Sequence, residues 1–315
     1  MRSLPLGLLL GALCLPAAAQ QSFVNWETPH VTPLSHDSTG QRLLVVNTPD
    51  NRLEVFDVSG AEPAPLFDVP VGLDPVSVRQ RTPNEVWVVN SISDTISVVD
   101  LTSGTVVRTI DTADEPADVC FAGNPVRAFV SCSQPNLVQV FDPAAPTAPL
   151  AEIPILGEEP RAMATSADGS EVYVAVFESG NGSTILGGGI DPSQGILTLR
   201  NVVSDPLSPY GGQNPPPNDG PNFTPAQAAG NPPPPAVGLI VKKDAQGRWM
   251  DDNAGDWTGL VSGSNSWRSD RPVGWDVIDN DVAVIDASTY AVTYREHLMN
   301  INMALAVHPI SGAVT

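Results

Sequence analysis

Short valine-rich runs, several of them alternating between apolar and polar positions, recur along the first half of the chain. Residues 86–89, 96–99 and 106–110 read VWVV, ISVV and VVRTI. A period of two residues is typical of a β-strand, because successive side chains point to opposite faces of the sheet. Polar segments rich in Gly, Asn, Asp and Pro separate the runs. The pattern therefore predicts short antiparallel strands joined by turns.

The strands fall into repeats of roughly 42 residues, each with four short strands, which is the period of a β-propeller blade. The aspartate that ends the third strand recurs at Asp57, Asp100 and Asp142, and a proline opens the next unit at Pro75, Pro116 and Pro160. The units align over residues 36–58, 81–101, 122–143 and from 166 onward. We therefore predict an all-β fold, a β-propeller of four-stranded blades.

The fourth repeat breaks after Phe177, and its third strand returns at residues 279–286. The chain between them is rich in Pro and Gly up to about Ala236 and is predicted to be partly extended there. The part from 238 to 260 looks ordered. A fifth repeat opens at Asn302 and the sequence stops at Thr315. About four and a half blades would leave sheet edges open, so we expect an incomplete propeller from the N-terminal part of a longer protein.

The N-terminus predicts export. Arg2 precedes an apolar run from Leu4 to Leu15 and an Ala17-Ala18-Ala19 stretch, the pattern of a Sec-type signal peptide cut after Ala19. The expected organisation is a signal peptide (1–19), blades one to three with the first half of blade four (20–177), an insertion (178–277), and the rest of blade four with the start of blade five (278–315). We expect the protein in the periplasm, at the cell surface or outside the cell.

Charge limits the partners. The chain has 35 Asp and Glu against 15 Lys and Arg, a net charge of −20. An acidic chain lacks the basic surface that a nucleic acid requires, so no nucleic-acid partner is expected. No integral membrane segment is predicted either, because no segment after the leader has about 18 consecutive apolar residues.

The only cysteines after the leader are Cys120 and Cys132. If the intervening turn centres on Asn124-Pro125, Cys120 lies opposite Phe129 and Cys132 lies on the other face of the hairpin. Export permits a disulfide, which would require a bulge. The alternatives are therefore this disulfide or two small buried side chains.

Candidate binding residues lie in the insertion. Its acidic loop, residues 251–256, offers several oxygen ligands for Ca²⁺, and Asp276, Asp279 and Asp281 could add more. The alternative is that the Asp and Asn residues of this loop form Asx turns. Its tryptophans either pack the insertion onto the propeller face or form a surface on which carbohydrate stacks. The candidates are Trp249, Trp257, Trp267, Trp275, Asp251 and Asp256. The four histidines are scattered, and no familiar catalytic motif is present.

The repeats resemble the YVTN family of β-propeller proteins. The stretches that correspond to Tyr-Val-Thr-Asn are residues 44–47, 87–90, 129–132 and 173–176, and the asparagine is kept in two of them. This resemblance implies a secreted propeller that serves as a binding scaffold for a protein or carbohydrate, at its face or through the insertion. The family contains a few enzymes, but we expect no enzyme activity in this stretch.

Two other functions are implied by resemblance. The opening residues 23–30, the stretch 251–257 and residues 281–286 resemble large bacterial propellers that continue into a cytochrome c-like domain. That layout implies a redox protein whose haem c attachment lies beyond residue 315, with no cofactor in this stretch. A lactonase-like propeller hydrolase is the second alternative, although no blade supplies a clear set of His and Glu ligands.

Overall fold

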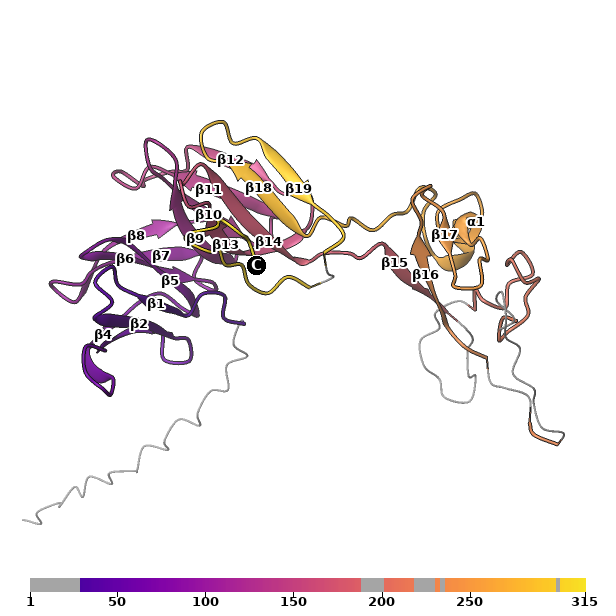
Figure 1. Ribbon diagram of the computed structural model, residues 1–315, viewed down its shortest axis with the longest axis horizontal. Coiled ribbons are helices and arrows are strands. Elements are labelled where there is room, and N and C mark those ends of the chain that lie inside the picture. The colour runs from indigo at the N-terminus through magenta and orange to yellow at the C-terminus, as the bar shows by residue number, and fades with distance from the viewer. Residues whose placement is uncertain (1–28, 188–200, 218–229, 233–235, 299–300) are drawn as a thin grey trace, which may run out of the picture.

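The computed structural model describes residues 29–187, 201–217, 230–232, 236–298 and 301–315. The predicted signal peptide, residues 1–19, lies outside the described residues. Four antiparallel sheets of four strands each form the larger part of the molecule, and a sheet of three strands lies to one side (Figure 1). The predicted all-β propeller with four-stranded blades and an insertion in the fourth is confirmed.

Blades one to three are built from consecutive strands. Blade one contains β1 (Leu34–His36), β2 (Arg42–Asn47), β3 (Arg52–Asp57) and β4 (Ala64–Pro70). Blade two contains β5 (Pro75–Thr82), β6 (Glu85–Asn90), β7 (Thr95–Asp100) and β8 (Thr105–Asp111). Blade three contains β9 (Pro116–Ala122), β10 (Arg127–Cys132), β11 (Leu137–Phe141) and β12 (Ala151–Pro154).

Blade four is assembled from two distant parts of the chain. It contains β13 (Glu158–Thr165), β14 (Glu171–Glu178), β18 (Val282–Asp286) and β19 (Val292–Arg295). The third strand thus returns where the sequence predicts it. A bridge between Val307 and Val314 starts a further hairpin within the predicted fifth repeat.

The hydrophobic core lies between neighbouring blades. On β6, Trp87 and Val89 belong to the core shared with blade three, whereas Val86 and Val88 belong to the core shared with blade one. The strand therefore reads as a continuous apolar run, because both of its faces are buried. Each fully buried side chain of this size contributes roughly 1.5–3 kcal/mol to stability, so packing between blades is a major stabilising term.

A repeated hydrogen bond fixes each blade relative to the next. A side-chain oxygen in the turn between the second and third strands accepts the N–H of the residue before the opening proline of the following blade. The pairs are Asn51 with Asp74 at 2.8 Å, Asp94 with Glu115 at 3.0 Å, and Asn136 with Glu159 at 2.9 Å. We call this contact the Asx clamp. All six residues have φ between +50° and +59°, a region that Asn and Asp tolerate better than most residues.

We expect Asn51→Ala to lower the free energy of unfolding by about 2 kcal/mol, because it leaves the Asp74 N–H without its acceptor and places alanine at positive φ. Asn51→Asp is the matched control, since it keeps the acceptor oxygen that Asp94 provides in blade two. Urea unfolding measures both variants. Equal destabilisation by the two substitutions would show that the clamp oxygen is not what matters.

The structure decides against the disulfide. Cys120 pairs with Phe129 across the β9–β10 hairpin, as the predicted turn requires, and packs in the core between blades three and four. Cys132 packs in the core between blades two and three, on the opposite face. Both are free thiols, and burial raises their pKa, that of Cys132 to about 12. The β9–β10 ladder does shift register between Ser131 and Cys132, but the shift leaves the two cysteines in separate cores.

Within the part of the chain that the structure covers, none of the helices has the length and apolar character needed to cross a bilayer. The helical elements, α1 (Thr258–Val261) and a 3₁₀ turn (Ser266–Ser269), both lie in the insertion.

Candidate functional site

The insertion folds as a small module on a paired stem. The stem is held by the Gly180 N–H, which donates to the Ile278 carbonyl at 3.0 Å, and by the Lys243 N–H, which donates to the Gly182 carbonyl at 2.7 Å. Beyond it lie β15 (Ser183–Leu186), β16 (Leu239–Lys243), β17 (Trp249–Met250) and α1. β16 pairs with β15 on one side and β17 on the other. Figure 1 shows this module beside the blades and connected to them by the stem.

Blade four is intact despite the insertion. β14 and β18 pair without a register shift from Glu171 opposite Asp286 to Ala175 opposite Val282. Val172 and Val174 from β14 share one core with Ile285 from β18 and with side chains of blade three. The module is therefore presented by a blade that packs as its neighbours do.

Tryptophans form the core of the module. Trp249 and Trp257 are each 1% exposed and pack against apolar residues of the same module, namely Leu186, Val202, Val203, Val241, Leu260 and Val261. Trp275 contacts Trp249 with ring centroids 5.5 Å apart, and the Arg271 guanidinium lies 4.6 Å from the Trp275 ring. These three side chains stabilise the module itself. The interpretation that they pack the insertion onto the propeller face is therefore wrong.

Trp267 differs from the other three candidates. Its side chain is 58% exposed, and the Arg268 guanidinium lies 5.0 Å from its ring. An exposed indole can stack on a polar or carbohydrate ligand, whereas a buried indole is out of the ligand's reach. The sugar-stacking interpretation is therefore open only to Trp267 among the four predicted tryptophans.

Asp251 organises the acidic loop. One carboxylate oxygen accepts bonds from the N–H groups of Asn253 (2.9 Å) and Gly255 (2.7 Å) and from the Tyr210 hydroxyl (3.0 Å). The other accepts the Trp257 indole N–H at 2.8 Å. Burial and the bond to Asp251 raise the pKa of Tyr210, so the phenol stays protonated and remains a donor.

This geometry favours the Asx-turn alternative for the loop over the Ca²⁺ alternative. N–H and O–H donors occupy the positions around Asp251 from which a cation would be bound. Asp256 accepts the Thr258 N–H at 2.9 Å, at the start of α1. Among the described residues, no group of three or more His, Cys, Asp and Glu side chains is placed to hold a metal. The loop is a carboxylate-centred turn, the other alternative that the sequence left open.

We expect Asp251→Asn to unfold the module without unfolding the blades, because it places an amide N–H₂ where the Trp257 indole N–H or the other donors need an oxygen. The expected loss is about 1–3 kcal/mol. Near-ultraviolet circular dichroism of the tryptophans measures the module. Asp252→Asn is the matched control, since the Asp252 side chain makes no hydrogen bond with a described residue. Identical behaviour of the two variants would contradict this account.

A polar cleft of 310 Å³ lies where the module joins blade four. His297 Nδ1 lies 2.6 Å from an Asp279 carboxylate oxygen, and the Lys243 ammonium pairs with Asp276 across the stem. The His297 N–H also donates to Asp279, and His297 has φ +64°. This contact resembles the Asx clamp, but Asp279 lacks the positive φ of the three clamp acceptors, and Leu298 rather than a proline follows His297.

The His297 ring adds chemistry that the three Asx clamps lack. Its side chain is 78% exposed, while that of Asp279 is 12% exposed. A neutral imidazole that donates from Nδ1 to the carboxylate presents Nε2 to solvent as an acceptor. No local pattern in the sequence indicates this pair, because its members are 18 positions apart and meet only where the insertion returns to the blade.

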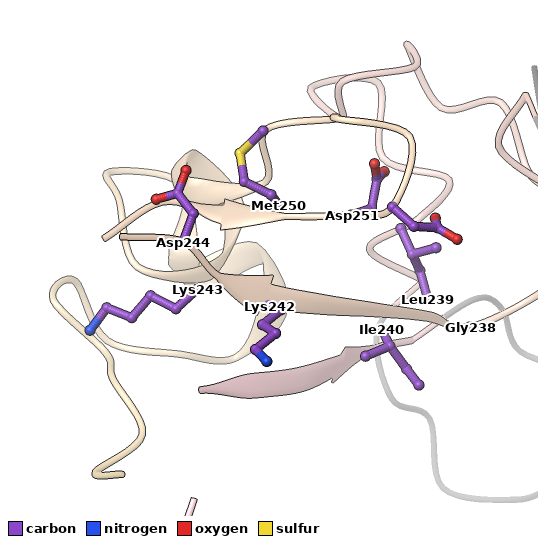
Figure 2. Close-up of a pocket in the computed structure, with 9 residues that line it drawn as sticks. Gly238, Leu239, Ile240, Lys242, Lys243, Asp244, Met250 and Asp251 are labelled. Carbon is purple, nitrogen blue, oxygen red and sulfur yellow. The ribbon is translucent and has the colours of Figure 1, made fainter. Parts of the chain in front are cut away.

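A second, larger groove of 720 Å³ runs along β16 (Figure 2). Ile240, Lys242, Met250, Asp251 and Asp252 are among the residues that line it. Of the six predicted site residues, the structure brings Trp249, Trp257, Trp275 and Asp251 together in the module core, and only Asp251 reaches this groove. The groove is open along an edge of the sheet.

Comparison with known proteins identifies no family. No family model and no curated protein matches the chain. Among solved structures, hydrazine synthase from Kuenenia stuttgartiensis is similar, with a TM-score of 0.45 and 16% identity over 95% of this chain and 98% of that chain. A selenomethionine-substituted virginiamycin B lyase from Staphylococcus aureus has a TM-score of 0.38 and 11% identity over 46% of this chain and 48% of its own. At these values the likeness carries no inference about activity.

Proposed function

We propose that this protein is a secreted, YVTN-type β-propeller that acts as a binding scaffold in the periplasm or at the cell surface. The blades hold the scaffold rigid, and the insertion is the element that recognises a protein or carbohydrate partner. Export and the family assignment rest on the leader and the repeats. The redox and hydrolase alternatives remain predictions from resemblance alone.

One observation carries the proposal: the insertion has its own tryptophan core, while blade four keeps an unbroken β14–β18 ladder. A short turn of the kind that blade three uses would connect the two strands without a core or a paired stem, and without the closure cost of a long loop. Long structured insertions at loop positions commonly carry function on a rigid framework.

Exposed apolar side chains on the module support a binding role. Ile185 and Ile240 are 63% and 65% exposed and lie opposite each other on β15 and β16. Trp267 and Val273 are also exposed. Ile185 and Ile240 are cross-strand neighbours, and adjacent exposed apolar side chains of this kind indicate an interaction site. The net charge of −20 favours neutral or basic partners over anionic ones.

The test is a chain in which residues 181–277 are replaced by Ser-Gln-Pro-Asn, the turn that blade three uses at Ser133–Asn136. This replacement keeps Ser179, Asp279 and the bond between Gly180 and Ile278, which hold blade four. We expect an envelope fraction of the native host to retain the full chain saturably and to lose at least about 90% of that retention with the shortened chain, as removal of the main contact surface requires. Both chains should show the same thermal transition of the blades. Protease treatment of the envelope then distinguishes a protein partner from carbohydrate.

Equal retention of the two chains would contradict the proposed role of the insertion. The comparison requires that the shortened chain is folded, and its thermal transition shows directly whether it is.

A further inference from the structure

The central strand of the module has an open edge. β17 is two residues long, and on the β16 side it reaches only Lys242 and Lys243. Its other side carries a bridge between Met250 and Asp256. On that side, Leu239, Ile240 and Val241 have no strand neighbour among the residues that the structure describes. The 720 Å³ groove lies along this stretch, as Figure 2 shows.

Asp251 is the reason that β17 ends so early. In the β16–β17 register, the residue after Met250 would pair with Val241. Asp252, the next residue, would exchange backbone bonds with Ile240. Instead it lies in a turn that the Ala254 N–H closes on the Asp251 carbonyl at 3.2 Å and that the Asp251 carboxylate holds through the Gly255 N–H. The turn that supports the tryptophan core is therefore also the reason that no described residue pairs with Ile240 on this side of β16.

The open edge presents backbone hydrogen-bonding groups. The Lys243 N–H donates to Gly182 on the β15 side, and the Asp244 N–H donates to Arg248 on the β17 side. Successive residues of a strand direct these groups to opposite sides, and neither ladder of β16 has a register shift. The N–H and C=O groups of Ile240 therefore point into the groove. Unpaired edges of this kind are templates for an added strand.

Side chains define what such a strand would carry. Ile240 and its cross-strand neighbour Ile185 form an exposed apolar surface next to the edge. Lys242 lies two residues from Ile240 on the same strand face and forms no ion pair with a described residue. Asp252, which lines the groove from the turn after β17, forms none either. An apolar strand with opposite charges at its two ends would complement these groups.

We propose that the groove binds an extended peptide segment of a partner protein, which adds to β16 as a new strand. The segment takes the positions that β17 leaves and so runs antiparallel to β16, with an acidic residue toward Lys242 and a basic residue toward Asp252. This inference rests on the proposed function and specifies its partner as a protein. A carbohydrate hydroxyl can bond a single backbone group, but only a peptide strand continues the ladder of N–H and C=O groups along β16.

The probe is a fluorescent acetyl-Glu-Val-Val-Val-Arg-amide peptide, and its binding to the full chain is followed by fluorescence anisotropy. Ile240→Pro removes the N–H that faces the groove and no N–H that β15 uses. We expect it to weaken binding about tenfold, the effect of one or two backbone hydrogen bonds. Ile240→Val, which keeps the N–H, is the matched control and should bind as the native chain does.

A charge exchange tests the same site without touching the backbone. Lys242→Glu should weaken the binding of acetyl-Glu-Val-Val-Val-Arg-amide and strengthen that of acetyl-Arg-Val-Val-Val-Glu-amide, in which the two charges are exchanged. This pair keeps the proposal falsifiable if Ile240→Pro disturbs the near-ultraviolet signal of the tryptophan core.

The proposal is overturned if the native chain shows no saturable binding at about 1 mM peptide, the range of a weak but specific contact. It is also overturned if folded Ile240→Pro binds as tightly as Ile240→Val, or if Lys242→Glu does not change the preferred charge order. The envelope assay separates this inference from the proposed function. Undiminished envelope retention of Ile240→Pro refutes the peptide site alone, whereas full retention of the chain without residues 181–277 refutes the function of the insertion.

Discussion

The pairing of β14 with β18 is the contact on which the rest of the molecule depends. It completes blade four from two segments of chain, and the buried bond between Ser179 and Asp281 at its end joins residues 102 positions apart. Closing a structureless loop of that length costs about 3 kcal/mol more than closing a four-residue turn. The stem offsets this cost, because the module brings its own two ends together through Gly180 and Ile278. The insertion and the blade are therefore compatible because the insertion is folded.

Asp251 connects stability to the proposed function of the module. Its carboxylate satisfies the buried indole of Trp257 and the hydroxyl of Tyr210, and its backbone turns the chain away from β16. The first effect stabilises the core, and the second leaves the edge of Ile240 open. A sheet edge is normally an aggregation hazard. Here the edge is short and has Lys242 at one end, which limits uncontrolled pairing while leaving room for a specific strand.

The sequence was sufficient for the blades because their pattern repeats. Alternating apolar residues, an aspartate after the third strand and a proline at each opening predicted four sheets, and the return of blade four at residues 279–286 followed from the same pattern. The sequence also placed Cys120 opposite Phe129, which left Cys132 on the other face. These inferences depend on local periodicity, which can be recognised in a single sequence.

The insertion could not be predicted in the same way, since it has no period. Trp249 and Trp257 are buried by Leu186, Val203 and Val241, which come from separate segments, so nothing local distinguishes a core tryptophan from a surface one. The acidic loop contains oxygen atoms suited to Ca²⁺, but the Asp251 carboxylate accepts hydrogen bonds instead, and one of its donors, Tyr210, is 41 positions away in the sequence. The open edge depends on where β17 ends, which the Asp251 turn decides.

Native-state hydrogen exchange tests the central claim most directly, namely that a separately folded module is carried by an intact blade. If blade four is intact, amides of β14 and β18 exchange as slowly as those of β6 and β10. Amides of β15 and β16 should exchange together as a second, less protected unit. Exchange of β14 and β18 at the same rate as β15 and β16 would contradict the account, because blade four and the insertion would then open as one unit.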